Sequence, residues 1–431
     1  MRYVIIGGSA AGISAVEAIR SIDQKGEITV ISDEKYPLYS RCLITYYLAK
    51  SIDEKKLKFR KEDFFQENRV NAILGVKVEK VMPEQKKVKL SDGRELTYDK
   101  LLIATGSSPK KLGIAGEDRE GVFGIRRIDD IKGIEKIIGR IKTVVVLGGG
   151  LIGMRDAYAL NALGKKVKVI VKSNRILSQM LDEASSEIIR KVVEKNGIEI
   201  ITGLDAVEIT GDKQVKGLKL DNGSKLDCEL VIIGKGVDPN TELVAGTAIK
   251  VHGGIITDGY MKTSAADVYA AGDVALTEDI LSGETTINAI WPCAVEQGRI
   301  AGLNMAGEKE KYDGSMSMNS LTFYGIPVIS IGITRPKGEG FEQILQKDTE
   351  RNIYKKMVIR DKRLAGIILV NSVTQAGVYG ELIRKKIDIS SIKKGLLDSN
   401  FNFMKILPLV QDNMDSFIEK GFQDLLLSCG K

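Results

Sequence analysis

Short runs of aliphatic and β-branched residues recur along this 431-residue chain, each bounded by glycine or by polar residues. Residues 2–6, 27–31 and 144–147 have this composition, which is typical of strands buried on both faces of a parallel sheet. The first and third runs each lead into a glycine-rich turn and then into an amphipathic segment. The pattern predicts strand–turn–helix–strand units over residues 1–31 and 144–171, and therefore an α/β fold.

Other regions show different patterns. Residues 70–104 are predicted to form short antiparallel strands that end in a buried strand. From Tyr312 onward the chain is rich in β-type segments, with D361-K-R-L-A-G as a hairpin turn. After Glu381 the pattern is mainly helical. We expect residues 312–431 to form a separate α+β domain.

Composition and charge narrow the class of protein. Hydrophobic residues make up 43% of the chain and charged residues 28%, which is ordinary for a globular protein of two or three domains. The 64 basic and 57 acidic residues are interleaved, so the net charge of +7 favours a solvated surface over a nucleic-acid-binding face. An acidic electron-transfer partner is a lesser alternative.

The chain has no feature that points to a membrane or to export. No apolar stretch approaches the roughly 20 residues of a membrane span. Met1 leads almost directly into the first predicted strand, which leaves no room for a signal peptide. We therefore expect a cytoplasmic protein.

The cysteines and the single histidine argue against a metal site. The four cysteines are far apart and form no C-x-x-C pair, and His252 is the only histidine. We expect no metal centre, and no catalytic role for Cys228, Cys293, Cys429 or His252.

The two glycine-rich turns are V4-I-I-G-G-S-A-A-G12 and V144-V-V-L-G-G-G-L-I-G153. Such a turn lets the backbone N–H groups at the start of a helix reach a pyrophosphate. Two of them in one chain indicate two dinucleotides held so that electrons can pass between them. This pattern favours a flavoprotein oxidoreductase.

Two further motifs, T105-G-S-S-P109 and V268-Y-A-A-G-D273, complete a resemblance to a known family. In this order, the four motifs resemble those of the pyridine nucleotide–disulfide oxidoreductases, the two-dinucleotide flavoproteins. The nearest branches are NADH oxidase, coenzyme A disulfide reductase and NADH:rubredoxin reductase. The resemblance covers essentially the whole chain.

The resemblance implies two Rossmann-like domains and a C-terminal dimerisation domain. The FAD-binding domain would comprise residues 1–115 and 241–311, interrupted by an NAD(P)-binding domain over residues 116–240. The α+β domain over residues 312–431 would form the interface of a homodimer. FAD and NAD(P)H are the implied cofactors.

The implied FAD site draws on residues from several segments. Ser32 stands where an acid normally binds the adenosine ribose, so Asp33 or Glu34 is expected to do so. Arg41 would reach the pyrophosphate, and Asp273 would hydrogen-bond the ribityl chain. The implied residues are Gly7, Gly8, Ser9, Ala10, Ala11, Gly12, Asp33, Glu34, Arg41, Cys42, Val78, Ala104, Thr105, Gly106, Gly272, Asp273, Ala289 and Gln297.

The implied NAD(P) site departs from the family pattern at the end of its second strand. Val171 stands where NADH-binding members carry a glutamate, so Lys172, together with Lys166 or Arg175, would pair with a 2′-phosphate. This favours NADPH or the use of both nicotinamides; alternatively, Val171 is only a buried strand end and Lys172 a solvated charge. The implied residues are Gly148, Gly150, Ile152, Gly153, Val171, Lys172 and Gly236.

Arg155 is a second departure. The family pattern G-x-I-G-x-E places a glutamate there, near the junction of flavin and nicotinamide. This charge reversal puts ordinary nicotinamide binding in doubt.

Cys42 is the candidate catalytic residue. The chain has no C-x-x-x-x-C, which excludes a redox disulfide of the glutathione reductase type. Cys42 aligns with the single cysteine of NADH oxidases and coenzyme A disulfide reductases, although Thr45 replaces the proline of their C-x-x-P-Y pattern. Near Arg41 and a helix start, a lowered thiol pKa would let it act as a thiolate or sulfenate. The alternative is a small apolar residue that packs beside the flavin.

These observations predict an FAD-dependent NAD(P)H oxidoreductase. It would pass hydride from NAD(P)H to the flavin and electrons on to a small disulfide, an oxygen species or a redox protein. The alternative is a flavoprotein subunit that exchanges electrons between NAD(P) and an iron–sulfur or rubredoxin-like partner without a redox cysteine. The intact motifs disfavour a third possibility, a non-catalytic flavin-binding protein.

Overall fold

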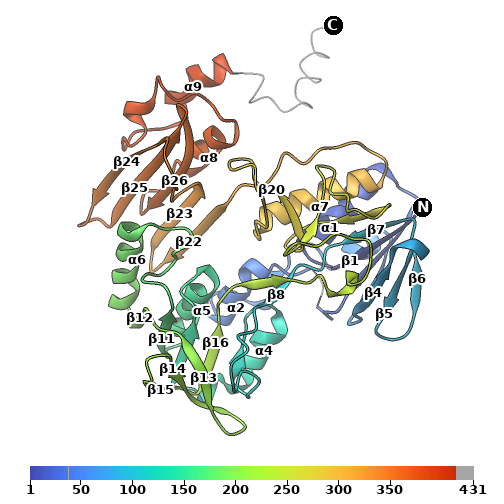
Figure 1. Cartoon of the computed structure of the whole chain (residues 1–431), viewed down its shortest axis with the longest axis horizontal. Coiled ribbons are helices and arrows are strands. Elements are labelled where there is room, and N and C mark those ends of the chain that lie inside the picture. Colours follow the sequence, from blue (N-terminus) through green and yellow to red (C-terminus); the bar gives the residue numbers. More distant parts are fainter. Residues whose placement is uncertain (37, 414–431) are drawn as a thin grey trace. The chain divides into compact units, whose positions relative to one another are not determined.

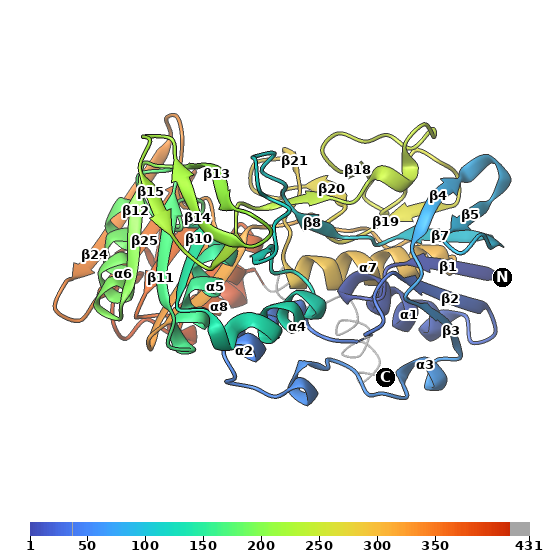
Figure 2. The same ribbon diagram turned by 90° about the horizontal axis from the view of Figure 1, so that it is seen from below.

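The computed structural model describes residues 1–36 and 38–413, and Figures 1 and 2 show it from two sides. Its contacts divide the chain into two compact units. Unit 1 comprises residues 1–176 and 197–315, and unit 2 comprises residues 177–196 and the chain from Met316 onward. Cys429 and the end of the predicted C-terminal domain lie outside the described residues. The four-part domain division stays a prediction.

The first sheet of unit 1 is parallel and has the strand order β19-β7-β1-β2-β3. Its strands are β1 (Arg2–Ile6), β2 (Glu27–Ser32), β3 (Val70–Leu74), β7 (Lys100–Ile103) and β19 (Val268–Ala270). Helix α1 (Ala10–Ile22) follows β1 directly. The predicted strands over 2–6 and 27–31 are confirmed. The prediction of antiparallel strands is wrong for β3, which runs parallel to β2.

The second sheet of unit 1 repeats this arrangement in the order β12-β11-β10-β16-β9. Its strands are β9 (Val122–Phe123), β10 (Thr143–Leu147), β11 (Lys166–Val171), β12 (Ile198–Thr202) and β16 (Leu230–Ile233). Helix α5 (Leu151–Ala162) follows the central strand β10, as α1 follows β1. The chain therefore contains two Rossmann-like units, each with a glycine turn after its central strand.

Smaller sheets complete unit 1. In each large sheet, a three-stranded antiparallel meander is inserted along the chain between two of the parallel strands. A two-stranded ribbon pairs the segment after β7 with the segment after β16. The meanders are β4 (Val78–Met82), β5 (Lys87–Leu90), β6 (Glu95–Thr97) and β13 (Ala206–Gly211), β14 (Val215–Leu220), β15 (Lys225–Asp227). The ribbon is β8 (Ser107–Pro109) with β17 (Val237–Pro239). A further small sheet is mixed, because β18 (Ile255–Ile256) runs parallel to β20 (Ala275–Glu278) and β21 (Thr285–Thr286) runs antiparallel to it.

Helix α7 (Trp291–Met305) packs closely along α1 (Figure 2). A Cβ atom at Gly298 would lie 2.1 Å from the carbonyl oxygen of Ala11, so only glycine allows this approach. The other helices of unit 1 are α2 (Ile44–Leu48), α3 (Phe64–Glu67) and α4 (Ile128–Ile137), with 3-10 turns η1 (Arg41–Leu43), η2 (Glu54–Leu57), η3 (Pro83–Gln85), η4 (Ile138–Arg140) and η5 (Glu242–Val244).

Unit 2 is an antiparallel sheet with helices, as the sequence predicts for the C-terminal region. The sheet order is β22-β23-β26-β25-β24. The two-residue turn between β25 and β26 has positive φ at Asp361 (50°) and Lys362 (62°), which is typical of a tight hairpin and confirms the predicted turn. The strands are β22 (Met318–Phe323), β23 (Ile326–Gly332), β24 (Phe341–Asp348), β25 (Ile353–Arg360) and β26 (Arg363–Val370).

Helix α6 (Glu183–Lys195) belongs to unit 2 although it connects two strands of unit 1. Its cap Asp182 accepts hydrogen bonds from Ser185 N (3.0 Å), Tyr354 Oη (2.6 Å) and Lys356 Nζ (3.1 Å). The same carboxylate therefore begins the helix and fixes it to the sheet. The remaining helices are α8 (Ala376–Arg384), η6 (Lys393–Gly395) and α9 (Phe403–Asp412), so the helical tail is only partly as predicted.

Within residues 1–36 and 38–413, no helix combines the length and apolar character that a membrane crossing requires.

Candidate functional site: two glycine turns and the Cys42 segment

The two glycine turns have nearly the same backbone geometry. The φ angle is 117° at Gly7 and 118° at Gly148. Gly7 N donates to the Ile31 carbonyl at 2.8 Å, and Gly148 N donates to the Ile170 carbonyl at 2.8 Å. The repeat seen in the sheets thus extends to individual hydrogen bonds.

Neither turn tolerates a side chain at its first or its last glycine. A Cβ atom at Gly7 would lie 2.1 Å from the Ala104 carbonyl oxygen, and one at Gly148 would lie 2.4 Å from the Gly234 carbonyl oxygen. At the last glycine of the first turn, Gly12, a Cβ atom would lie 1.9 Å from the Gly7 oxygen, and Gly153 repeats this clash at 2.1 Å. Both turns require glycine because of positive φ and close packing, as in dinucleotide-binding turns.

The helices after both turns begin without a side-chain cap. The N-cap residues of α1 and α5 are Ser9 and Gly150. The Ser9 side chain makes no capping hydrogen bond, and Gly150 has no side chain to make one. The first N–H groups of each helix are therefore available to an anionic group, which the helix dipole also favours. A Cβ atom at Gly150 would meet no atom within 4 Å, so a ligand has room there. The two cradles fit the pyrophosphates of FAD and NAD(P).

Asp273 lies where a second set of FAD contacts is predicted. Its Oδ2 accepts hydrogen bonds from Ser107 Oγ (2.9 Å) and Arg126 Nη2 (2.5 Å). The turn before it depends on Gln297, a buried residue of α7 whose Oε1 accepts from Gly272 N at 2.8 Å. Gln297 thereby shapes the turn that presents Asp273.

The predicted loop at Thr105 and Gly106 is tied to the other half of unit 1. Thr105 Oγ1 donates to the Asn240 carbonyl at 2.8 Å, and Asn240 Nδ2 donates back to the Thr105 carbonyl at 2.9 Å. Ala104 lies against Gly7 as described above. Val78 is buried at the start of β4, and Ala289 is exposed just before α7.

The two acids after β2 have different surroundings. Glu34 is buried, and its two oxygens bond Arg41 and Tyr39. Asp33 pairs with Arg127 at 2.9 Å and its side chain remains 39% exposed. Asp33 is therefore the more accessible candidate for a ribose hydroxyl.

Val171 is buried and packs against the second turn. A Cβ atom at Gly149 would lie 2.7 Å from Val171 Cγ2, so a side chain at position 149 would displace Val171. Lys172 follows with its side chain 80% exposed, 4.0 Å from Asp205. Arg175 lies in the same loop, and its Nε is buried without a hydrogen-bond partner.

Lys166 was a wrong candidate for a 2′-phosphate. It is the first residue of β11, whereas Val171 is the last. At about 3.3 Å per residue the two ends lie roughly 17 Å apart. Only the carboxyl end of β11 adjoins the glycine turn, where Gly148 N donates to the Ile170 carbonyl.

Cys42 is exposed and lies at the start of a helical segment, in the 3-10 turn η1 that leads into α2. The expectation of a lowered thiol pKa is wrong for the described protein. The surrounding protein raises the pKa of the Cys42 thiol through desolvation, which outweighs the opposing effects of Arg155, a hydrogen bond from Ser40, and Arg126. Cys228 and Cys293 are buried, and His252 is exposed in a bend.

Arg155 reaches from α5 to the Cys42 segment. Its Nη2 donates to the Cys42 carbonyl at 2.8 Å, and its guanidinium lies 4.9 Å from the centroid of the Tyr46 ring. The side chain thus joins α5, the helix after the second glycine turn, to the segment between β2 and β3 that carries Cys42.

Asp156, the next residue, is fully buried and neither carboxylate oxygen has a hydrogen-bond partner. Burial raises its pKa well above the usual value; the charge of Asp130 adds to this and Arg155 opposes it. A buried charge without a partner is costly, so the carboxyl is held neutral.

Arg126, Arg127 and Asp130 are site residues that the motif analysis missed. Asp130 Oδ2 accepts from the backbone N–H groups of Arg126 (2.8 Å) and Arg127 (2.7 Å) at the start of α4. The two arginine side chains then reach Asp273 and Asp33. The sequence does contain a signal for this cap: Asp130 follows R126-R127 by a few residues at a predicted helix start.

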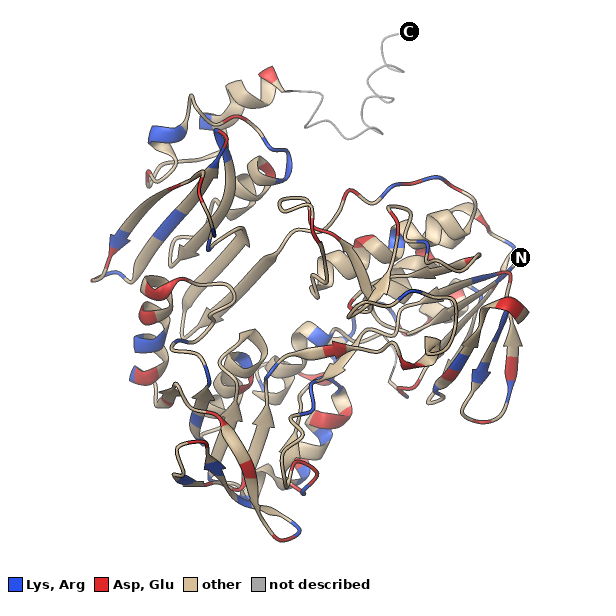
Figure 3. Ribbon diagram, in the orientation of Figure 1, with Lys and Arg blue, Asp and Glu red and all other residues tan. Residues whose placement is uncertain are grey.

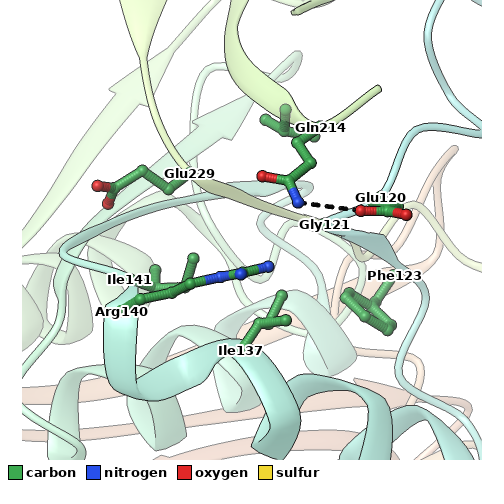
Figure 4. Close-up of a pocket in the computed structure, with 9 residues that line it drawn as sticks. Glu120, Gly121, Phe123, Ile137, Arg140, Ile141, Gln214 and Glu229 are labelled. Atoms are coloured by element: carbon green, nitrogen blue, oxygen red, sulfur yellow. Dashed lines mark hydrogen bonds between the residues drawn. The ribbon is translucent and has the colours of Figure 1, made fainter. Parts of the chain in front are cut away.

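A cavity of about 380 Å³ lies elsewhere in unit 1 and shares no residue with either glycine turn. Figure 4 shows Arg140 extending over an apolar floor that includes Phe123 and Ile137, with Gln214 donating to Glu120 at 3.0 Å. Figure 3 shows basic and acidic segments interleaved along the ribbons. In the described part of the chain, no group of three or more His, Cys, Asp or Glu residues is arranged to hold a metal ion.

Comparisons with known proteins agree with this geometry. Residues 1–298 match the family described as pyridine nucleotide-disulphide oxidoreductase, and residues 318–387 match the rubredoxin NAD+ reductase C-terminal domain. The chain is 31% identical, over 91% of its length and 93% of the relative, to NADH-dependent phenylglyoxylate dehydrogenase subunit epsilon of Aromatoleum evansii.

Two further relatives are similar over most of the chain. The assimilatory nitrate reductase electron transfer subunit of Bacillus subtilis is 30% identical over 92% of this chain, which spans about half (51%) of that relative. Among solved structures, a ferredoxin reductase from Rhodopseudomonas palustris is 28% identical with a TM-score of 0.79, covering 86% of this chain and 91% of that one.

The neutral state of Asp156 predicts a pH-dependent stability. The pKa of the Asp156 carboxyl is raised in the folded protein, so this carboxyl ionises at lower pH in the unfolded chain than in the folded one. The free energy of unfolding therefore falls as pH rises above about 4, by about 1.4 kcal/mol per pH unit, until the carboxyl of the folded protein also ionises. Asp156→Leu should therefore increase the free energy of unfolding near neutral pH, with a gain that shrinks toward acid pH. Urea unfolding across this range measures it.

The matched control is Asp221→Asn, at an exposed turn residue, which should change the free energy of unfolding only slightly. If the free energy of unfolding of Asp156→Leu differs from that of the wild type by the same amount at every pH, Asp156 is not neutral in the folded protein.

Proposed function

Because the chain belongs to the pyridine nucleotide–disulphide oxidoreductase family, we propose that it carries electrons from NAD(P)H through FAD to an iron–sulfur or rubredoxin-like protein. The paired glycine cradles of unit 1 carry this proposal, because each fits one dinucleotide and they share one compact unit. FAD, when bound, accepts hydride and releases electrons singly.

Three observations support a protein as the acceptor. Residues 318–387 match a C-terminal domain described for rubredoxin NAD+ reductase. The relatives include an electron transfer subunit and a ferredoxin reductase. The Cys42 thiol, whose pKa is raised, is poorly suited to be the thiolate that a disulfide substrate requires.

The electrons balance for a one-electron acceptor. One NAD(P)H supplies a hydride, which is two electrons and a proton. Two oxidised iron centres take up one electron each, and one proton is released to solvent. The protein's residues bind and orient the two cofactors and polarise the reacting groups. Asp273 and Asp33 act as ligands of the FAD hydroxyls.

We assign NADPH as the preferred donor, with NADH as the alternative. Val171 offers no carboxylate to a 2′-hydroxyl, whereas Lys172 and Arg175 stand in the loop just beyond it. The buried, unpartnered Nε of Arg175 is a donor that a phosphate oxygen would satisfy after a small movement.

A small disulfide or oxygen species is the second candidate acceptor, and the exposure of Cys42 favours it. Such a reaction needs the thiol, whereas electron transfer to an iron–sulfur protein does not. The predicted homodimer and the cytoplasmic location stay predictions.

Replacing Cys42 separates the two acceptors. Cys42→Ser should retain NAD(P)H-driven reduction of an added rubredoxin within about twofold, because single-electron transfer makes no bond to the thiol. Anaerobic turnover with the rubredoxin and, separately, with a small disulfide is the measurement. A loss of rubredoxin reduction of about tenfold or more, with bound flavin unchanged, would overturn the protein-acceptor assignment.

Val171→Glu tests the nicotinamide assignment. The new carboxylate should accept a hydrogen bond from a 2′-hydroxyl and repel a 2′-phosphate, so the NADPH/NADH preference should fall by about tenfold, or about 1.4 kcal/mol. Lys166→Glu adds the same acid at the far end of the strand and should leave the ratio unchanged. Rates of flavin reduction by each nicotinamide give the ratio, and an unmoved ratio in Val171→Glu would refute the assignment.

A further inference from the structure

Three charged residues meet at the carboxyl edge of the second large sheet. Lys172 follows β11 directly, Lys235 is the second residue after β16, and Asp205 is the third residue after β12. These strands and the central strand β10 run parallel to one another, so their carboxyl ends share one edge. Ligands of such sheets bind outside this edge. The three charges therefore lie where the proposed nicotinamide site is expected.

Asp205 pairs with both lysines. Lys235 Nζ donates to its Oδ1, and Lys172 Nζ lies 4.0 Å from its Oδ2. The side chains of Asp205 and Lys235 are 19% and 20% exposed, whereas that of Lys172 is 80% exposed. The Asp205–Lys235 pair is thus partly buried and close, while Lys172 is held loosely enough to turn toward a ligand.

Backbone contacts fix this group of charges beside the second glycine turn. A Cβ atom at Gly148 would lie 3.2 Å from Lys235 N, so the backbone of Lys235 touches the first glycine of the turn. Gly203 N donates to the Val171 carbonyl at 2.8 Å, which ties the chain just before Asp205 to the end of β11. Asp205 is therefore anchored from both sides of the turn.

The positive charges at this edge depend on Asp205 for compensation. Within residues 1–36 and 38–413, no other carboxylate pairs with Lys172 or Lys235, and Arg175 of the same loop pairs with no acid. Asp221 is the next acid along the meander, and its N–H donates to the Asp205 carbonyl at 2.9 Å. Asp221 is exposed and pairs with neither lysine among these residues.

We propose that Asp205 determines the balance between NADPH and NADH. The 2′-phosphate of NADPH is attracted by Lys172 and repelled by Asp205, whereas the uncharged 2′-hydroxyl of NADH responds little to either charge. With no carboxylate at Val171, Asp205 supplies from the end of β12 the negative charge that limits the preference for NADPH. This inference deepens the proposed function and rests on its nicotinamide site.

Equilibrium binding tests the proposal without turnover. Titration calorimetry of the oxidised, FAD-loaded protein with NADP+ and, separately, with NAD+ gives two dissociation constants. The main variant is Asp205→Asn, which removes the charge but keeps an oxygen that can accept from Ala206 N, a bond of 2.8 Å in the wild type. Asp205→Ser is a second uncharged variant, and Asp205→Glu restores the charge. Bound flavin content shows that each variant is folded.

The matched control is Asp212→Asn. Asp212 also pairs with a lysine, Lys216, at 2.6 Å. It lies just after the last residue of β13, whereas Asp205 lies just before the first. At about 3.3 Å per residue the two acids are roughly 20 Å apart, which is about twice the Debye length at 0.1 M salt. The control therefore removes the same charge from an ion pair outside the site.

We expect Asp205→Asn, at about 0.1 M salt, to tighten NADP+ binding relative to NAD+ by about tenfold. The gain should shrink at about 1 M salt, because salt screens the charges. Adding Lys172→Gln to Asp205→Asn should reverse most of the gain, since Lys172 is the freed charge that reaches the phosphate. Asp212→Asn and Asp205→Glu should each keep the wild-type ratio within about twofold.

Three results would overturn the proposal. Equal ratios for Asp205→Asn and Asp212→Asn would remove the role of Asp205 and leave the proposed function standing. A shift that is undiminished at about 1 M salt, or that Asp205→Glu shares, would show an effect of structure rather than of charge. A wild-type protein that binds neither nucleotide, and whose flavin neither NADPH nor NADH reduces, would refute the proposed function and this inference with it.

Discussion

The structure of unit 1 depends on a close approach of backbone to backbone that occurs twice. At Gly7 and at Gly148, the chain turns from the central strand against the carbonyl of the next strand, and any Cβ atom would collide there. This contact places the start of a helix at the carboxyl edge of a parallel sheet, with its first N–H groups uncapped. Electrostatics then favours an anion at both places.

A second level of organisation concerns the acids of the first site. Asp130 fixes the backbone at the start of α4, and the two arginines of that turn reach Asp33 and Asp273. These acids come from segments far apart in the chain. One helix start thus holds both ends of the expected FAD site in register, while Arg155 joins α5 to the Cys42 segment.

Much of this was predictable from local patterns. The glycine turns, their strands and the hairpin at Asp361 follow from short-range rules of backbone conformation and hydrophobic spacing. The candidate site residues around Asp273 came from motif resemblance, and their roles stay predictions.

The rest depended on long-range contacts that no local pattern contains. The ion pairs of Arg126 with Asp273 and of Arg127 with Asp33 are visible only in the folded structure, because each joins segments that lie far apart in the sequence. The pKa of Cys42 was misjudged because desolvation by surrounding protein, invisible in the sequence, outweighs the nearby arginines. The placement of α6 with unit 2 likewise rests on the bonds of Asp182 to the C-terminal sheet.

We propose that two dinucleotides occupy the two cradles and exchange electrons. An anaerobic spectrum of the purified chain, taken before and after adding NADPH or NADH, tests this directly. We expect a stoichiometric, tightly held flavin whose visible absorbance bleaches with at least one nicotinamide. A protein that binds no flavin, or a bound flavin that neither nicotinamide reduces, would contradict it.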